Sequence, residues 1–152
     1  MFSYLVLKLK IMEHTIDHLL HINAPISEVF NAITKADNLS QWYTTDIEDN
    51  ADQTLTMKWG EMFLKIKCTT IENKKITWDF LESSMPITSM YMTYELSENE
   101  GKTRVKLTFG DFLEKSDFYA NQNFSTAKYL ESLRQFCQTG KGEAFGSELY
   151  RS

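Results

Sequence analysis

Residues 22–34 of the chain read INAPISEVFNAIT, and this stretch marks a change from strand to helix. An alternating run of apolar and polar residues ends at Ile22. Pro25 then suits the first turn of a helix, where a backbone N–H has no partner within the helix. Apolar residues follow at helical spacings of three and four, at Ile26, Val29, Phe30 and Ile33. The sequence therefore predicts a strand, a short amphipathic helix, and a second helical turn over residues 36–42.

Six segments alternate apolar and polar residues with a period of two, at 15–22, 54–59, 64–68, 75–80, 90–96 and 103–109. This alternation is typical of strands in an antiparallel sheet that buries one face. The polar turns 72–74 and 98–101 are short enough to join neighbouring antiparallel strands. An α+β fold with an antiparallel sheet is therefore predicted.

A sheet with one apolar face needs a cover, and the longest helical pattern in the chain lies over residues 121–138, with Gly140 placed to end it. Its expected apolar stripe contains Phe124, Ala127, Leu130, Leu133 and Cys137. The prediction is a sheet packed against this long C-terminal helix.

One domain is expected over residues 13–140, because no linker or repeat interrupts the pattern. Residues 1–12 form an N-terminal extension, which is either an additional strand or a segment upstream of a start at Met12. Its apolar run 4–7 is too short for a signal peptide or a membrane span. Residues 141–152 are expected to form a loosely ordered tail, apart from Phe145 and Tyr150.

The charge of the chain argues against two kinds of partner. The formal net charge of its 152 residues is −5. An acidic domain without a basic patch is poorly suited to nucleic acid or to an anionic membrane surface. Cys68 and Cys137 do not form a CxxC motif, and we expect them to be reduced thiols in a cytoplasmic protein.

The stretch 22–34 and its continuation ADNLSQWY at 36–43 resemble the opening of START-like (SRPBCC, helix-grip) domains. Within that superfamily, the chain is most similar to the homologues of the activator of heat-shock-protein-90 ATPase. The resemblance covers about residues 13–140 and implies a curved sheet wrapped around the long helix, with an apolar cavity inside. The chain departs from the usual pattern at Tyr43, where the family often has a second tryptophan, and at Asn123-Phe124, where a Gly-Trp pair is common.

No catalytic residue, metal site or cofactor is expected. His14, His18 and His21 lie on one strand, where residues four apart are separated by roughly 13 Å, too far to share one ion. The sequence contains no HExxH, no GxSxG and no glycine-rich phosphate loop.

The inward strand positions and the long helix supply the expected cavity wall: His18, Trp42, Met57, Trp59, Trp78, Phe80, Met92, Tyr94, Phe109, Leu130 and Leu133. The same residues could equally pack a solid core. The leading functional prediction is that a small hydrophobic molecule binds there without covalent chemistry.

Two alternatives stay open at this point. One is a co-chaperone-like or other protein-interaction module, as the family resemblance implies. The other is a cyclase or hydrolase that uses polar groups of the cavity, for which His18 is the only titratable candidate. A homodimer is also plausible, because Leu19, Phe63, Leu81 and Tyr91 are expected on the outer face of the sheet.

Overall fold

Among the described residues, seven antiparallel strands form a curved sheet in the order β1-β7-β6-β5-β4-β3-β2, so β1 pairs with β7. The computed structural model describes residues 13–151. The strands are β1 His14–Ile22, β2 Asp46–Asp49, β3 Thr54–Trp59, β4 Met62–Ile71, β5 Lys75–Ser83, β6 Tyr91–Asn99 and β7 Lys102–Phe112.

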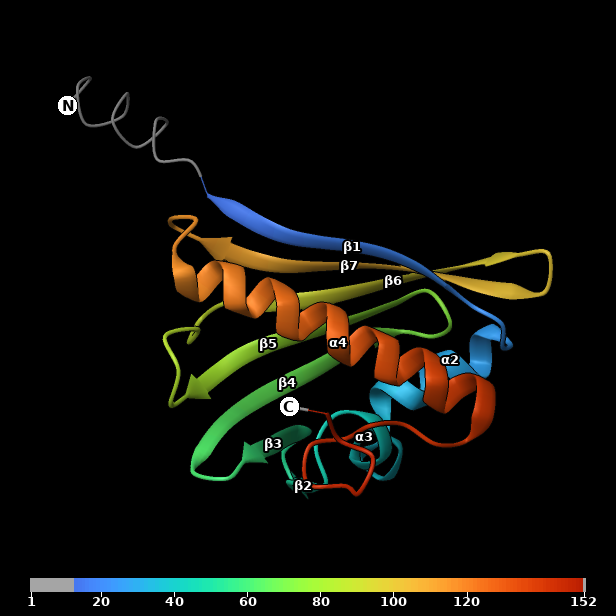
Figure 1. Cartoon of the computed structure of the whole chain (residues 1–152), viewed down its shortest axis with the longest axis horizontal. Helices are drawn as coiled ribbons and strands as arrows, with labels where there is room; N and C mark the ends of the chain where they lie inside the picture. Colours follow the sequence, from blue (N-terminus) through green and yellow to red (C-terminus); the bar gives the residue numbers. More distant parts are fainter. Residues whose placement is uncertain (1–12, 152) are drawn as a thin grey trace.

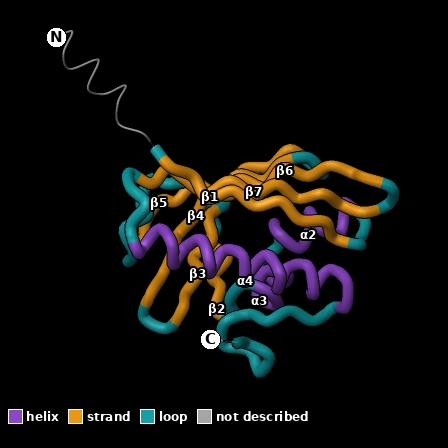
Figure 2. Tube along the Cα trace, turned by 45° about the horizontal axis from the view of Figure 1, so that its top comes forward, coloured by secondary structure: helices purple, strands orange, loops and turns teal. Residues whose placement is uncertain are grey.

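The helices are α2 Ile26–Thr34, α3 Ala36–Trp42 and α4 Asp117–Thr139. Figure 1 shows α4 crossing one face of the sheet, with α2 and α3 near its C-terminal end. Figure 2 shows how the strands bend around this helix. The α+β helix-grip architecture predicted from the sequence is therefore confirmed.

Both ends of α4 follow standard capping chemistry. The Ser116 side chain accepts a hydrogen bond from the Tyr119 N–H at 3.2 Å, which begins the helix four residues before the predicted start. Gly140 adopts a left-handed conformation with φ of 83°, and its N–H donates to the Phe136 carbonyl at 2.8 Å. These two caps fix the length of the helix that covers the sheet.

The strand register places large side chains on the face that α4 covers. Trp78 of β5 pairs with Met92 of β6, and Met92 pairs in turn with Phe109 of β7. All three side chains are buried. Burial of such side chains from water is the main force that holds the sheet against the helix.

The apolar stripe predicted for the long helix is wrong in its first half. Phe124 is 66% exposed and Ala127 is exposed as well, whereas Thr126, Leu130, Ser132 and Leu133 are buried. The inward face of α4 is therefore rotated relative to the prediction, and it carries polar residues in that half. Polar residues are tolerated there because this half of the helix faces a pocket and not a packed core.

The tail is also different from the expectation of loose order. Phe145 pairs with the segment after α3: its N–H donates to the Tyr43 carbonyl and its carbonyl accepts from the Thr45 N–H, each at 3.0 Å. Ala144 is fully buried. Residues 141–151 thus pack as part of the domain, near β2 and α3 in Figure 1.

Three further observations complete the fold. The sequence did not predict β2, a short acidic strand that pairs with β3. The prediction that residues 1–12 form an additional strand or a segment upstream of a start at Met12 lies outside the described residues. Across residues 13–151, no helix is long and apolar enough to cross a membrane.

Candidate functional site

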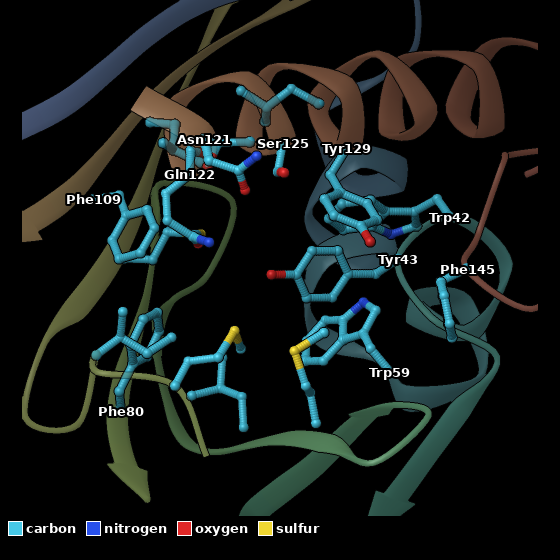
Figure 3. Close-up of a pocket in the computed structure, with 18 of the residues that line it drawn as sticks. Trp42, Tyr43, Trp59, Phe80, Phe109, Asn121, Gln122, Ser125, Tyr129 and Phe145 are labelled. Atoms are coloured by element: carbon cyan, nitrogen blue, oxygen red, sulfur yellow. The ribbon is translucent and has the colours of Figure 1, made fainter. Parts of the chain in front are cut away.

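A pocket of about 350 Å³ lies between α4 and the covered face of the sheet. Figure 3 shows side chains from the helix, the strands and the tail surrounding open space. The lining is Trp42, Tyr43, Trp59, Met62, Leu64, Phe80, Met85, Ile87, Met92, Tyr94, Leu107, Phe109, Phe118, Asn121, Gln122, Ser125, Thr126, Tyr129, Leu130, Phe145 and Tyr150. The volume lies within the range of small-molecule sites, which is roughly 300–1,000 Å³.

Packed aromatic rings form one end of the pocket around Tyr43, which directly follows α3. Its ring centroid lies 5.3 Å from that of Trp59 and 4.7 Å from that of Tyr129, both in edge-on geometry. The neighbouring Trp42 is fixed because its indole N–H donates to the Ala32 carbonyl at 2.8 Å. These contacts hold Tyr43 in a defined orientation.

The Tyr43 hydroxyl is a polar group without a protein partner. The residue is only 7% exposed, and its hydroxyl points into the open space of the pocket (Figure 3). Within the part of the chain that the structure describes, no hydrogen bond satisfies it. Because it opens onto the pocket, this hydroxyl can donate to or accept from a molecule bound there.

The opposite wall, on α4, is polar. Asn121, Gln122 and Ser125 project from the helix toward the pocket, as Figure 3 shows. Thr126 is buried but satisfies itself, since its hydroxyl donates to the Gln122 carbonyl at 2.7 Å. The side chains of the other three residues make no hydrogen bond to any residue in the range 13–151. Donors and acceptors on this wall are therefore free.

The lining contains no aspartate, glutamate, lysine, arginine or histidine among the described residues. Its ionisable groups are tyrosines. Burial raises the pKa of the Tyr43 and Tyr94 phenols. Burial, together with the neighbouring Tyr150, raises the pKa of Tyr129 to about 12, although the nearby Trp59 N–H acts in the opposite direction. These three phenols therefore stay protonated and uncharged near neutral pH.

Charged groups stand outside the lining, beside the tail. The Lys128 ammonium donates to the Arg151 carbonyl at 2.8 Å. The Arg151 guanidinium pairs with the Glu143 carboxylate at 2.8 Å. Both cations thus already have partners within the protein.

Of the residues predicted to line the cavity, the structure places these on the pocket: Trp42, Trp59, Phe80, Met92, Tyr94, Phe109 and Leu130. Trp78, Met57 and Leu133 lie outside the lining and are fully buried in the hydrophobic core. His18 also lies outside the lining; it is half-buried, and its Nε2 atom is buried without a partner in the described structure. Alternation along a strand identifies the inward face but not the position of an opening on that face.

The sequence reasoning missed Tyr43, the polar helix residues, and the two tail residues Phe145 and Tyr150 as lining. One signal could have revealed the helix residues. Gln122 and Thr126 occupy the helical positions that precede Leu130 and Leu133 on the same side, where a solid core would require apolar residues. A polar interruption in an inward stripe is typical of a cavity wall.

Comparison with known proteins gives the following matches. A model of the family described as Activator of Hsp90 ATPase homolog 1-like protein matches residues 23–138. The chain is similar to the Aha1 dimer from Colwellia psychrerythraea, solved in solution, with a TM-score of 0.76, 29% identity, and coverage of 85% of this chain and 99% of that one. No curated protein sequence matches the chain significantly.

More distant structures share the fold. The protein MLL2253 from Mesorhizobium loti matches with a TM-score of 0.67 and 17% identity, over 80% of this chain and 95% of that one. The protein SSP2350 from Staphylococcus saprophyticus matches with a TM-score of 0.64 and 17% identity, over 86% of this chain and 97% of that one. At these identities the likeness concerns the fold alone.

Proposed function

The chain belongs to the Activator of Hsp90 ATPase homolog 1-like family, within the START-like superfamily, and from this premise we propose that it binds a small hydrophobic molecule in its pocket without covalent chemistry. Membership confirms the resemblance seen in the sequence. A shared fold does not determine function, so the function depends on the groups that line the pocket.

The observation that carries this proposal is the contrast between the two halves of α4. Leu130 and Leu133 are buried against the sheet, whereas Gln122 and Ser125, one to three turns earlier, face about 350 Å³ of open space. The pocket opens to solvent and its wall is mostly apolar, so an apolar molecule bound there would remove that surface from water.

Non-covalent binding fits the groups that line the pocket better than catalysis does. A general acid or base near neutral pH needs a pKa close to the working pH. Burial raises the pKa of the lining phenols Tyr43, Tyr94 and Tyr129, which moves it further from neutral pH. His18, the candidate for a cyclase or hydrolase, lies outside the lining. These facts support a binding protein over the enzymatic alternative.

Thermal denaturation with a panel of apolar compounds, paired with native mass spectrometry, tests the proposal. At a hundredfold excess over its dissociation constant, a ligand should stabilise the fold by about 2.7 kcal/mol. For a domain of this size, that is a rise in Tm of several degrees.

A variant whose side chain fills the pocket tests whether the ligand binds there. Ser125→Trp places a large ring in the cavity, so it should abolish the ligand-induced rise in Tm. Asn123→Trp introduces the same ring at an exposed helix position outside the lining, and should preserve the rise. A rise that survives in Ser125→Trp would place the ligand elsewhere, and no hit with any compound would count against a carrier function.

A homodimer is proposed as the protein's state of assembly. The similar protein from Colwellia psychrerythraea was solved as a dimer. Of the side chains expected on the outer face of the sheet, Leu19 and Leu81 are exposed, while Phe63 and Tyr91 are half-buried. Light scattering coupled to size-exclusion chromatography should give twice the mass of the chain.

The protein-interaction alternative, suggested by the family description, would gain support if the panel yields no ligand.

We place the protein in the cytoplasm. Cys68 and Cys137 are free thiols, as expected in a reducing compartment. Burial raises the pKa of Cys68 to about 11 and that of Cys137 to about 12, so both remain unreactive thiols near neutral pH.

A further inference from the structure

Resting on the proposed function, we infer that the pocket selects an uncharged ligand that carries a hydrogen-bonding group, such as an amide, ketone or hydroxyl. That group would lie between the Tyr43 hydroxyl and the polar side chains of α4. The rest of the ligand would be apolar and would contact the sheet.

Polar groups face each other across the pocket. The Tyr43 hydroxyl enters the pocket from one side, while Gln122 and Ser125 enter from the helix, and their polar ends face the same space (Figure 3). A hydroxyl both donates and accepts, and an amide side chain presents two donors and one acceptor site. A neutral group that offers both a donor and an acceptor could therefore be satisfied on both sides.

The described lining of the pocket carries no charge. Every residue that lines the pocket is uncharged at neutral pH in the described part of the chain. A buried ion without a counter-charge is far less stable than the same ion in water, and neutral donors only partly compensate for the loss. The pocket therefore favours a neutral group over a carboxylate or an ammonium of the same size.

The cations nearest the tail do not change this conclusion. Lys128 donates to the Arg151 carbonyl and lies over the rings of Phe124 and Tyr150, at 5.6 Å and 5.7 Å from their centroids. Arg151 is paired with Glu143. Neither cation lines the pocket.

The rest of the ligand would contact the sheet side of the pocket. The sheet side of the pocket is built from aromatic and aliphatic residues, including Phe80 and Phe109, whose ring centroids lie 5.6 Å apart in edge-on geometry. Met62, Met85 and Met92 add adaptable side chains. Such a wall fits a mainly apolar body.

Three probes of matched shape test the inference: 2-naphthamide, 2-naphthoate and 2-methylnaphthalene. The first carries a neutral polar group, the second an isosteric carboxylate at neutral pH, and the third a methyl group. Isothermal titration calorimetry should show that 2-naphthamide binds at least tenfold more tightly than 2-naphthoate. It should also bind more tightly than 2-methylnaphthalene.

Tyr43→Phe isolates the contribution of the free hydroxyl. Because one hydrogen bond is worth roughly a threefold to tenfold change in affinity, this variant should weaken 2-naphthamide by about that factor and leave 2-methylnaphthalene unchanged. Tyr119→Phe is the control, since the Tyr119 hydroxyl donates to the Thr15 carbonyl and lies outside the lining. It should change the affinity for neither probe.

The outcomes separate the inference from the proposed function. If 2-naphthoate binds as tightly as 2-naphthamide, or if Tyr43→Phe leaves the amide affinity unchanged, the inference is wrong while the binding function stands. If none of the three probes binds, the inference and the proposed function both fail for molecules of this size. Tight, Tyr43-dependent binding of the amide alone supports both.

Discussion

Ser132 shows how one hydroxyl can join three segments of the chain. It is only 2% exposed, and its hydroxyl donates to the Trp42 carbonyl at 2.7 Å while it accepts from the Glu143 N–H at 2.7 Å. The helix α4, the end of α3 and the tail therefore meet at this side chain. The contact places Phe145 and Tyr150 where they line the pocket.

Gly142 permits the same approach of the tail. A Cβ atom at this position would lie 2.6 Å from the Gln41 carbonyl oxygen and 2.8 Å from the Trp42 Cα atom. Backbone atoms cannot move aside as a flexible side chain can. Any larger residue would push the tail away from α3. The tail can pack so closely because Gly142 has no side chain.

Ser132→Ala should lower the free energy of unfolding by about 2 kcal/mol. The substitution leaves a buried carbonyl and a buried N–H without a partner, and each such loss costs about 1–3 kcal/mol before local relaxation. Urea denaturation measures the change. Ser125→Ala is the matched control on the same helix, since Ser125 makes no hydrogen bond within residues 13–151, and its stability should stay within about 0.5 kcal/mol of the parent. Equal losses in the two variants would contradict the proposed role of Ser132.

At the scale of single elements, α4 has two distinct halves. Its C-terminal half packs against the sheet through Leu130 and Leu133, while its N-terminal half presents Gln122 and Ser125 to the pocket. Phe124 points away from the sheet and is exposed. The helix is therefore a core element at one end and a cavity wall at the other.

Leu133→Ala and Phe124→Ala test this division. Because Leu133 is fully buried, its truncation should cost about 2–5 kcal/mol, including the cavity left behind. Truncation of the exposed Phe124 should cost less than about 1 kcal/mol. Chemical denaturation of both variants gives the comparison. A large loss in Phe124→Ala, matched to that in Leu133→Ala, would mean that α4 is oriented as the sequence stripe suggested.

Most elements could be predicted from the sequence because their patterns are local. Alternation identified six strands, and Pro25 and Gly140 marked helix ends. The strand β2 could not be predicted, because Asp46–Asp49 is mostly charged and is defined by its pairing with β3. Its strand character comes from a tertiary contact and not from its own residues.

The site was predictable only in part for a related reason. Trp59, Phe80 and Phe109 line the pocket as their inward strand positions suggested. Trp78 shares the same face, but its ring packs 5.0 Å from that of Tyr94 and fills the core beside the pocket. Which inward residues reach an opening depends on how the tail and helix meet the sheet, which no local pattern encodes.

At the scale of the whole molecule, buried phenols should make the fold sensitive to alkaline pH. Tyr43, Tyr94 and Tyr129 have a raised pKa in the folded protein, the last at about 12. The unfolded chain loses the same protons near pH 10. Below about pH 10 the three groups contribute no pH dependence, and stability should fall as pH rises from about 10 toward 12 and above.

Urea midpoints measured between about pH 9 and pH 11 test this expectation, with near-ultraviolet absorbance reporting phenolate. The urea midpoint of Tyr129→Phe should decline less steeply with pH than that of the parent over the same interval, since the variant lacks one of the three phenols. Complete ionisation of all tyrosines in a protein that is still folded would contradict the burial of these phenols.

Methyl NMR can detect a ligand bound between α4 and the sheet. In protein labelled at the methionine methyl groups, addition of 2-naphthamide should shift the resonances of Met62, Met85 and Met92, which line the pocket. The resonance of Met57, buried in the core outside the lining, should move much less. Saturable shifts confined to the three lining methionines would support the account; no shifts, or shifts of Met57 equal to theirs, would contradict it.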